Sequence, residues 1–205
     1  MATLRQTFSD IASAIRAKGV SGTFKPIEMA SKIGEIQQGL DYGYLTFTAV
    51  EATTLTLKQN GSISPHKLLK STDGVNWVKW ENPSTNGISL NVGESVYLKA
   101  DEDALWRTAT DSDICNKLVS TGKIKCNGDI RSLVKPIALE DYSYFANKLF
   151  NSCNITNAPE LPYTNLTNHC YSSMFDWCKS LTTAPELPAT NLADYCYSTM
   201  FNNCI

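Results

Sequence analysis

No stretch of this 205-residue sequence is apolar for long enough to cross a bilayer as a helix, which takes about 18 to 20 residues. The first twenty residues carry polar or charged side chains every few positions, so they lack the apolar run of about 7 to 15 residues that marks a secretion signal. We therefore expect no membrane partner and no export through a signal peptide.

The sequence also lacks an excess of charge of either sign. It holds 18 Lys and Arg against 20 Asp and Glu, a net charge of -2, and no block of basic residues. Phosphate backbones are held by clustered Lys and Arg, so we expect no nucleic-acid partner. Because 42% of the residues are hydrophobic, the chain can bury a core and is not disordered.

Histidine is scarce, with only His66 and His169. His169 precedes Cys170, but a Cys–His nucleophile pair needs the two side chains within hydrogen-bond reach, and neighbours on a helix point about 100° apart. Paired metal ligands and a Gly-rich phosphate loop are also missing from the sequence. We expect no catalytic residue, no metal and no cofactor, and we interpret the chain as a binding protein, not an enzyme.

The seven cysteines are odd in number and show no C-x-x-C spacing. Most of them recur at repeat positions, which favours reduced, buried, small apolar side chains. A disulfide framework or a zinc site remains the alternative.

The last third of the chain repeats itself. Ala158–Pro162 returns as Ala184–Pro188 after 26 residues, and Cys170 and Met174 return as Cys196 and Met200. A fixed period of this length is typical of stacked supersecondary units. The steps of four in each unit predict a short helix after a strand and a proline corner, and each unit has one apolar side that a neighbour must cover. We therefore predict a solenoid over 131–205.

The middle of the chain alternates between apolar and polar residues in short runs separated by Asn-Gly, Asp-Gly and Gly turns. This pattern predicts an immunoglobulin-like antiparallel β-sandwich over 42–105, followed by a linker and capping strands over 106–130. Trp77 and Trp80 are three residues apart and should point to opposite faces, so at most one belongs to the core and the other is a candidate carbohydrate platform.

Two amphipathic helices are predicted over 1–41. Their apolar stripes consist of Leu4, Phe8, Ile11 and Ile15, and of Met29, Ile33 and Ile36. A helical hairpin of about 35 residues is too small to be stable alone, so these seven residues should contact other chains or a neighbouring protein. The predicted fold class is thus a multidomain, mainly β protein with short helices: a helical hairpin, a sandwich and a solenoid.

The N-terminal residues Phe8–Lys18 and Lys25–Ala30, with Ile33, resemble a segment found on many phage and prophage tail or fibre proteins. The resemblance covers about 30 residues. It implies that the N-terminal helices attach the chain to other virion proteins, in a homo-oligomer that we expect to be a trimer, and that the protein is made in the host cytoplasm and located in the virion.

The repeat sequence at 181–204 resembles the leucine-rich repeats of the BspA type, common in gut Bacteroidetes and in phages that infect them. This resemblance implies a solenoid whose variable surface binds a host receptor or glycan, and a chain that continues beyond residue 205, because no polar terminal unit follows the last repeat. A bacterial cell-surface adhesin of the same repeat class is the alternative to a phage fibre. The candidate receptor-binding residues are Tyr163, Asn165, Asp176, Trp177 and Lys179.

Overall fold

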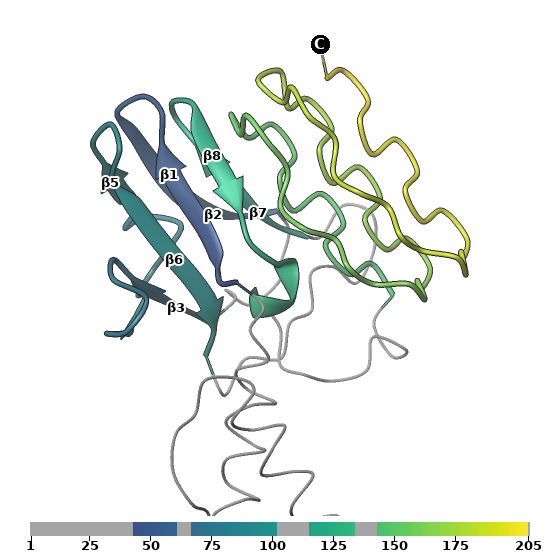
Figure 1. Cartoon of the computed structure of the whole chain (residues 1–205), viewed down its shortest axis with the longest axis horizontal. Coiled ribbons are helices and arrows are strands. Elements are labelled where there is room, and N and C mark those ends of the chain that lie inside the picture. The colour runs from purple at the N-terminus through teal and green to yellow at the C-terminus, as the bar shows by residue number, and fades with distance from the viewer. Residues whose placement is uncertain (1–42, 61–66, 102–114, 134–142, 205) are drawn as a thin grey trace, which may run out of the picture. The chain divides into compact units, whose positions relative to one another are not determined.

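The computed structural model describes residues 43–60, 67–101, 115–133 and 143–204 (Figure 1). The predicted helical hairpin over 1–41, with its two apolar stripes, lies outside these residues. Gly43–Ile205 forms one compact unit, so the middle of the chain and its repeats are described together.

Eight strands and one short 3-10 helix, η1, make up the regular structure of the described residues. They are β1 (Leu45–Ala49), β2 (Thr53–Asn60), β3 (Leu68–Ser71), β4 (Val78–Lys79), β5 (Ile88–Leu90), β6 (Ser95–Ala100), β7 (Cys115–Ser120), β8 (Ile124–Asn127) and η1 (Ile130–Leu133). One sheet has the order β4-β3-β6-β1-β8 and the other the order β5-β2-β7, with all pairs antiparallel.

The alternating sequence explains how the sheets bury one face. In β1 the side chains of Leu45, Phe47 and Ala49 are buried while Thr46 and Thr48 between them are half-buried, because successive side chains on a strand point to opposite faces. Phe47 lies opposite Val96 of β6 and, on its other side, opposite Cys126 of β8. The buried positions of both sheets form one hydrophobic core.

The predicted fold class is wrong for the described residues. They are essentially all β, with η1 as their one helical segment and no α-helix. The two antiparallel sheets agree with a sandwich in part, but their strand order differs from the immunoglobulin arrangement, in which a sheet A-B-E-D faces a sheet C-F-G. The structure therefore does not support an immunoglobulin-like sandwich or a leucine-rich solenoid with short helices.

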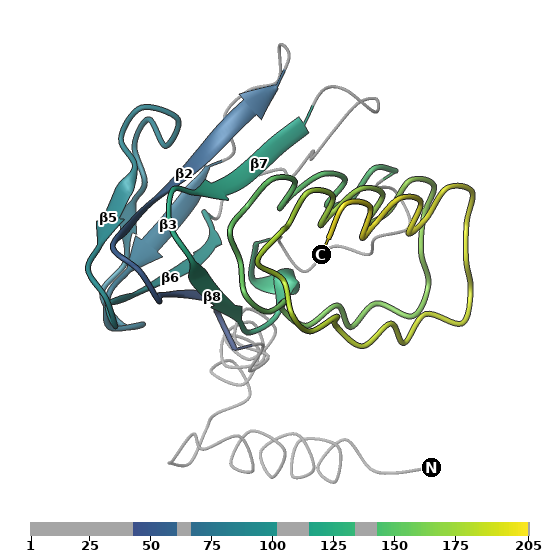
Figure 2. The same ribbon diagram turned by 90° about the horizontal axis from the view of Figure 1, so that it is seen from above.

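Strands β7 and β8 connect the two sheets to the repeats. They follow one another in the chain, yet β7 is an edge of the smaller sheet and β8 an edge of the larger one (Figure 2). The amide of Leu118 in β7 donates to the carbonyl of Leu149 (2.7 Å), and the amide of Ile124 in β8 donates to that of Asn154 (3.1 Å). Both edges are thus covered by the first repeat, and the core of the sheets continues into that of the repeats.

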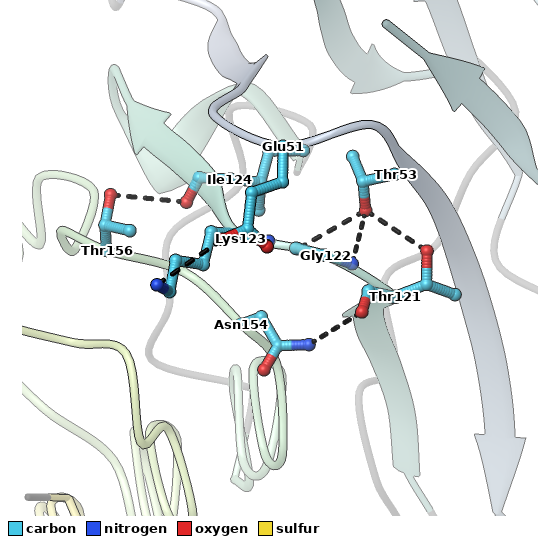
Figure 3. A network of polar contacts seen from close by, with 8 residues as sticks. All are labelled: Glu51, Thr53, Thr121, Gly122, Lys123, Ile124, Asn154 and Thr156. Carbon is cyan, nitrogen blue, oxygen red and sulfur yellow. Dashed lines mark hydrogen bonds and ion pairs between the residues drawn. The ribbon is translucent and has the colours of Figure 1, made fainter. Parts of the chain in front are cut away.

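The turn between β7 and β8 is held from both sides (Figure 3). The amide of Gly122 donates to Thr53 Oγ1 (2.8 Å), while Lys123 Nζ lies 3.4 Å from Glu51 Oε1. From the repeat side, Asn154 Nδ2 donates to the carbonyls of Ser120 (2.8 Å) and Thr121 (3.4 Å). Sandwich and repeats therefore share this turn.

Each repeat contains a segment that we call a turn ribbon, at 143–153, 168–178 and 194–204. A ribbon consists of overlapping turns. Every second residue donates its amide hydrogen to the carbonyl three residues earlier. In the second ribbon these donors are Cys170, Ser172, Met174, Asp176 and Cys178. Positive φ angles fall one residue before four of these donors, at His169, Tyr171, Ser173 and Trp177. A negative φ followed by a positive φ is the signature of a type II turn.

The turn ribbons replace the short helices predicted for the repeats. The prediction relied on apolar residues at steps of four, such as Leu166, Cys170 and Met174. On an α-helix, four residues turn through about 400°, so a strict step of four drifts around the axis. In the ribbon a step of four covers two turns, which returns Cys170, Met174 and Cys178 to the same buried side. The period was real, but it belongs to turns.

Candidate recognition surface on the repeats

The turn ribbons stack through equivalent residues spaced 25 and then 26 positions apart. Phe150, Phe175 and Phe201 stack in the interior, with centroids 5.6 Å apart at both steps and ring planes within 8°. Phe47 of β1 extends this ladder into the sandwich, at 6.2 Å from Phe150. Because aromatic pairs contribute beyond the area they bury, the ladder fixes the register between successive ribbons.

A second ladder runs along the half-buried and exposed side of the ribbons. Tyr144, His169 and Tyr195 stack with nearly parallel rings, with centroids 4.3 Å and 4.8 Å apart. The sequence prediction missed this ladder and interpreted His169 as surface variation. The signal was present, because the repeat period places the three residues at the same position of successive ribbons.

Three of the predicted receptor-binding residues lie together at the end of the second turn ribbon. Trp177 is 48% exposed, and the Nζ of Lys179 lies 5.0 Å from the centroid of its ring. The neighbouring carboxylate of Asp176 accepts hydrogen bonds from Asn151 Nδ2 and Asn202 Nδ2, both at 3.0 Å. Residues of three successive repeats thus hold Asp176 beside an exposed indole.

The other two predicted residues make their contacts elsewhere. Tyr163 is half-buried and its ring meets Phe145 edge-on at 5.6 Å. Asn165 is exposed, and its Oδ1 accepts a hydrogen bond from Asn191 Nδ2 (2.7 Å). The candidate recognition surface is therefore centred on the exposed Trp177, with Asp176 beside it in the chain and Lys179 Nζ near its ring.

The tryptophans of the sandwich divide as their spacing predicts. Trp80 is buried in the core and its Nε1 donates to the carbonyl of Asn86 (2.7 Å). Trp77 is half-buried, with Lys99 Nζ 4.3 Å from its ring centroid and Tyr44 edge-on at 4.7 Å. Because Lys99 and Tyr44 occupy its surroundings, Trp77 offers a smaller free face than Trp177.

The cysteines serve as core residues, as predicted. All seven are free; five are buried, and Cys196 and Cys204 are half-buried. Removal from water raises the pKa of Cys153 to about 11 and that of Cys170 to about 12. These thiols are protonated at neutral pH and therefore poor nucleophiles. Among the residues described, no three His, Cys, Asp or Glu side chains gather in a metal-binding group.

These buried thiols make the fold sensitive to alkali. An unfolded cysteine has a pKa of about 8.5, so between that value and the folded pKa near 11 to 12 only the unfolded chain has lost its proton. The free energy of unfolding that these buried thiols contribute is complete below about pH 8. Above that pH it falls by about 1.4 kcal/mol per pH unit for each such thiol. Urea unfolding in a reducing buffer at pH 7.5, 8.5 and 9.5 should show this decline. An unchanged midpoint would contradict the burial of these thiols.

Comparisons with protein-family models, with curated proteins and with solved structures give no match. Within the described ranges, no helix is long and apolar enough to cross a membrane. The resemblances to phage fibre segments and to BspA-type repeats therefore rest on the motif residues alone.

Proposed function

We propose that this protein is a structural, adhesive protein whose stacked repeats present a surface for a host receptor or glycan. The observation that carries the proposal is the exposed indole of Trp177, placed beside Asp176 and Lys179. An indole face with charged and hydrogen-bonding groups next to it suits a sugar ring, which is apolar on its faces and polar at its edge. No catalytic step is part of the proposal.

The geometry supports Trp177 as a binding residue because its surroundings are fixed. The amide of Trp177 donates to the carbonyl of Asn202 (2.9 Å), which anchors its backbone to the following repeat. Asp176 is held by Asn151 and Asn202, so its carboxylate does not have to be ordered when a ligand binds. Preordered groups bind with a smaller loss of conformational entropy. The equivalent positions, Ser152 and Asn203, carry no aromatic ring, so the surface is specific to the second repeat.

The place of the protein is the second part of the proposal. From the resemblance at Phe8–Lys18, we infer that the protein is part of a fibre of a phage particle. Its N-terminal residues would attach it to the particle, and its repeats would face outward. Immuno-electron microscopy of purified virions with an antibody against the repeats should label fibres. Label on the surface of uninfected bacteria, with none on virions, would contradict the fibre and favour a bacterial surface adhesin.

Trp177→Ala should weaken binding to host cells or to their isolated surface glycan by about tenfold or more, because truncating an aromatic binding residue costs about 1 to 2 kcal/mol or more. Binding would be measured by titrating the full chain onto host cells and onto a glycan array. Thermal unfolding of the variant should stay near that of the parent, since the side chain is 48% exposed.

Val92→Ala is the matched control, because Val92 is 69% exposed in the turn before β6 and distant in sequence from the repeats. It should leave binding unchanged. If the Trp177→Ala variant binds every ligand of the parent with the same affinity as the parent does, Trp177 is not part of the recognition surface.

A further inference from the structure

The hydrogen bonds between turn ribbons have a direction. In the first ribbon the amides of Tyr144, Lys148, Phe150 and Ser152 donate to carbonyls of the second; in the second, His169, Ser173, Phe175 and Trp177 donate to carbonyls of the third, at 2.8 to 3.0 Å. One amide of the second ribbon and one of the third donate in the opposite direction, from Tyr171 to Phe145 (2.9 Å) and from Tyr197 to Cys170 (3.1 Å). Each ribbon therefore presents mainly donors to the ribbon that follows it.

The third ribbon has the same donors without acceptors. Its equivalent amides belong to Tyr195, Thr199, Phe201 and Asn203, and none of them has an acceptor among the residues that the structure describes. The intervening amides, such as those of Ser198 and Met200, are already bonded within the ribbon. The open side of the stack is thus a row of backbone N–H groups, which we call the donor edge.

The same side exposes apolar residues that are buried one repeat earlier. Leu161 is 2% exposed and its equivalent Leu187 is 41% exposed; Leu166 is 8% exposed and Leu192 is 64% exposed. Tyr171 is fully buried between Phe145 and Tyr197, whereas Tyr197 itself is half-buried. Apolar exposure of this kind marks an interaction surface.

We propose that the donor edge and its apolar rim bind a polypeptide segment that adopts one more turn ribbon. Such a segment supplies the acceptors at the required positions, as Asp194, Ser198, Met200 and Asn202 do for the second ribbon. It also brings aromatic rings onto Tyr195 and Phe201, which close the two ladders on this side.

The polarity of the stack excludes association between two copies through this side. Two donor edges that face one another place N–H groups against N–H groups, which leaves the donors unpaired at a cost. The first ribbon is not open to a second copy either, because the carbonyl of Leu149 accepts from Leu118 of β7 and the ring of Phe150 packs against Phe47 of β1. The occupant must therefore be a segment from outside the described repeats, not a second copy of them.

A small anion is the main alternative occupant, since amides in a left- and right-handed alternation form concave anion sites. An anion would satisfy donors but leave Leu187, Leu192 and Tyr195 in water. The apolar rim therefore favours a polypeptide.

The test extends the full chain by a second copy of residues 180–204 placed after residue 205, which preserves the 26-residue spacing. Amide hydrogen exchange is then followed residue by residue. In the parent, the amides of the donor edge should exchange at least tenfold faster than those of His169, Ser173, Phe175 and Trp177. In the extended chain they should slow by at least tenfold, while the neighbouring amides of Ser198 and Met200 change much less.

Three outcomes would overturn the proposal. One is protection of the donor-edge amides in the parent itself, which would show that they already have acceptors. Another is a failure of the ordered copy to slow these amides more than an extension with the same 25 residues in scrambled order does. The third is an equal slowing of the donor-edge amides in the parent when sodium sulfate replaces sodium chloride at the same ionic strength. That result would identify an anion site.

Discussion

Gly128→Ala should destabilise the fold by about 4 kcal/mol or more, which is exceptional for the addition of a single methyl group. Gly128 follows β8 with a φ of 82°, in the left-handed region that costs a residue with a Cβ about 1 to 2 kcal/mol. A Cβ there would also overlap the carbonyl oxygen of Tyr44 and lie 2.5 Å from that of Gly43. The free energy of unfolding, from urea denaturation, measures the effect.

Gly93→Ala separates the two causes. Gly93 has a similar φ of 85°, yet a Cβ there would meet no atom within 4 Å. It should cost only about 1 to 2 kcal/mol, the penalty of the left-handed conformation. Equal losses for Gly93→Ala and Gly128→Ala would mean that the backbone of Gly43 and Tyr44 does not approach Gly128 as closely as described.

Phe175→Ala should cost about 3 to 5 kcal/mol, the range for removing a buried aromatic side chain. Phe175 is fully buried and stacks on both Phe150 and Phe201, so its loss opens a cavity that interrupts the interior ladder. The same denaturation experiment measures the loss.

Phe201→Ala is the matched control, because Phe201 has the same partner, Phe175, but is half-buried at the open side of the stack. Its loss should be clearly smaller, about 1 to 2 kcal/mol, since less area leaves the core. A smaller loss for Phe175→Ala than for Phe201→Ala would contradict the order of the ladder.

Alternation in the sequence was sufficient to predict strands in the middle of the chain. Leu45, Phe47 and Ala49 face the core because a strand has a period of two. The spacing of Trp77 and Trp80 indicated that at most one of them belongs to the core, and the structure shows that it is Trp80. The repeat period similarly indicated that the cysteines are core residues. These predictions depend on local geometry alone.

The rest depends on contacts that no local pattern encodes. Strand β7 pairs with β2 in one sheet and β8 pairs with β1 in the other, and both partners lie more than 50 residues earlier in the chain. The turn ribbons were missed because Tyr, Thr and His carry positive φ angles there, which are uncommon for residues other than Gly, Asn and Asp. Hydrogen bonds from the neighbouring repeats compensate for this conformation, and a single repeat does not contain them.

The Asp176, Trp177 and Lys179 group was predicted as part of a larger set because these residues are polar or aromatic at positions outside the apolar pattern. That criterion also selected Tyr163 and Asn165, which the structure places in packing and in a link between repeats. The contacts that each of these side chains makes with other repeats, including those of Asp176 with Asn151 and Asn202, are not visible in the sequence of a single repeat.

The first two turn ribbons each donate backbone hydrogen bonds to the ribbon that follows. Scalar couplings across hydrogen bonds, measured by NMR on the labelled protein, test this directly. We predict couplings from the amide of His169 to the carbonyl carbon of Asp194, and likewise from Ser173 to Ser198 and from Phe175 to Met200. Couplings from these amides to carbonyls four residues earlier, as in an α-helix, would contradict the account.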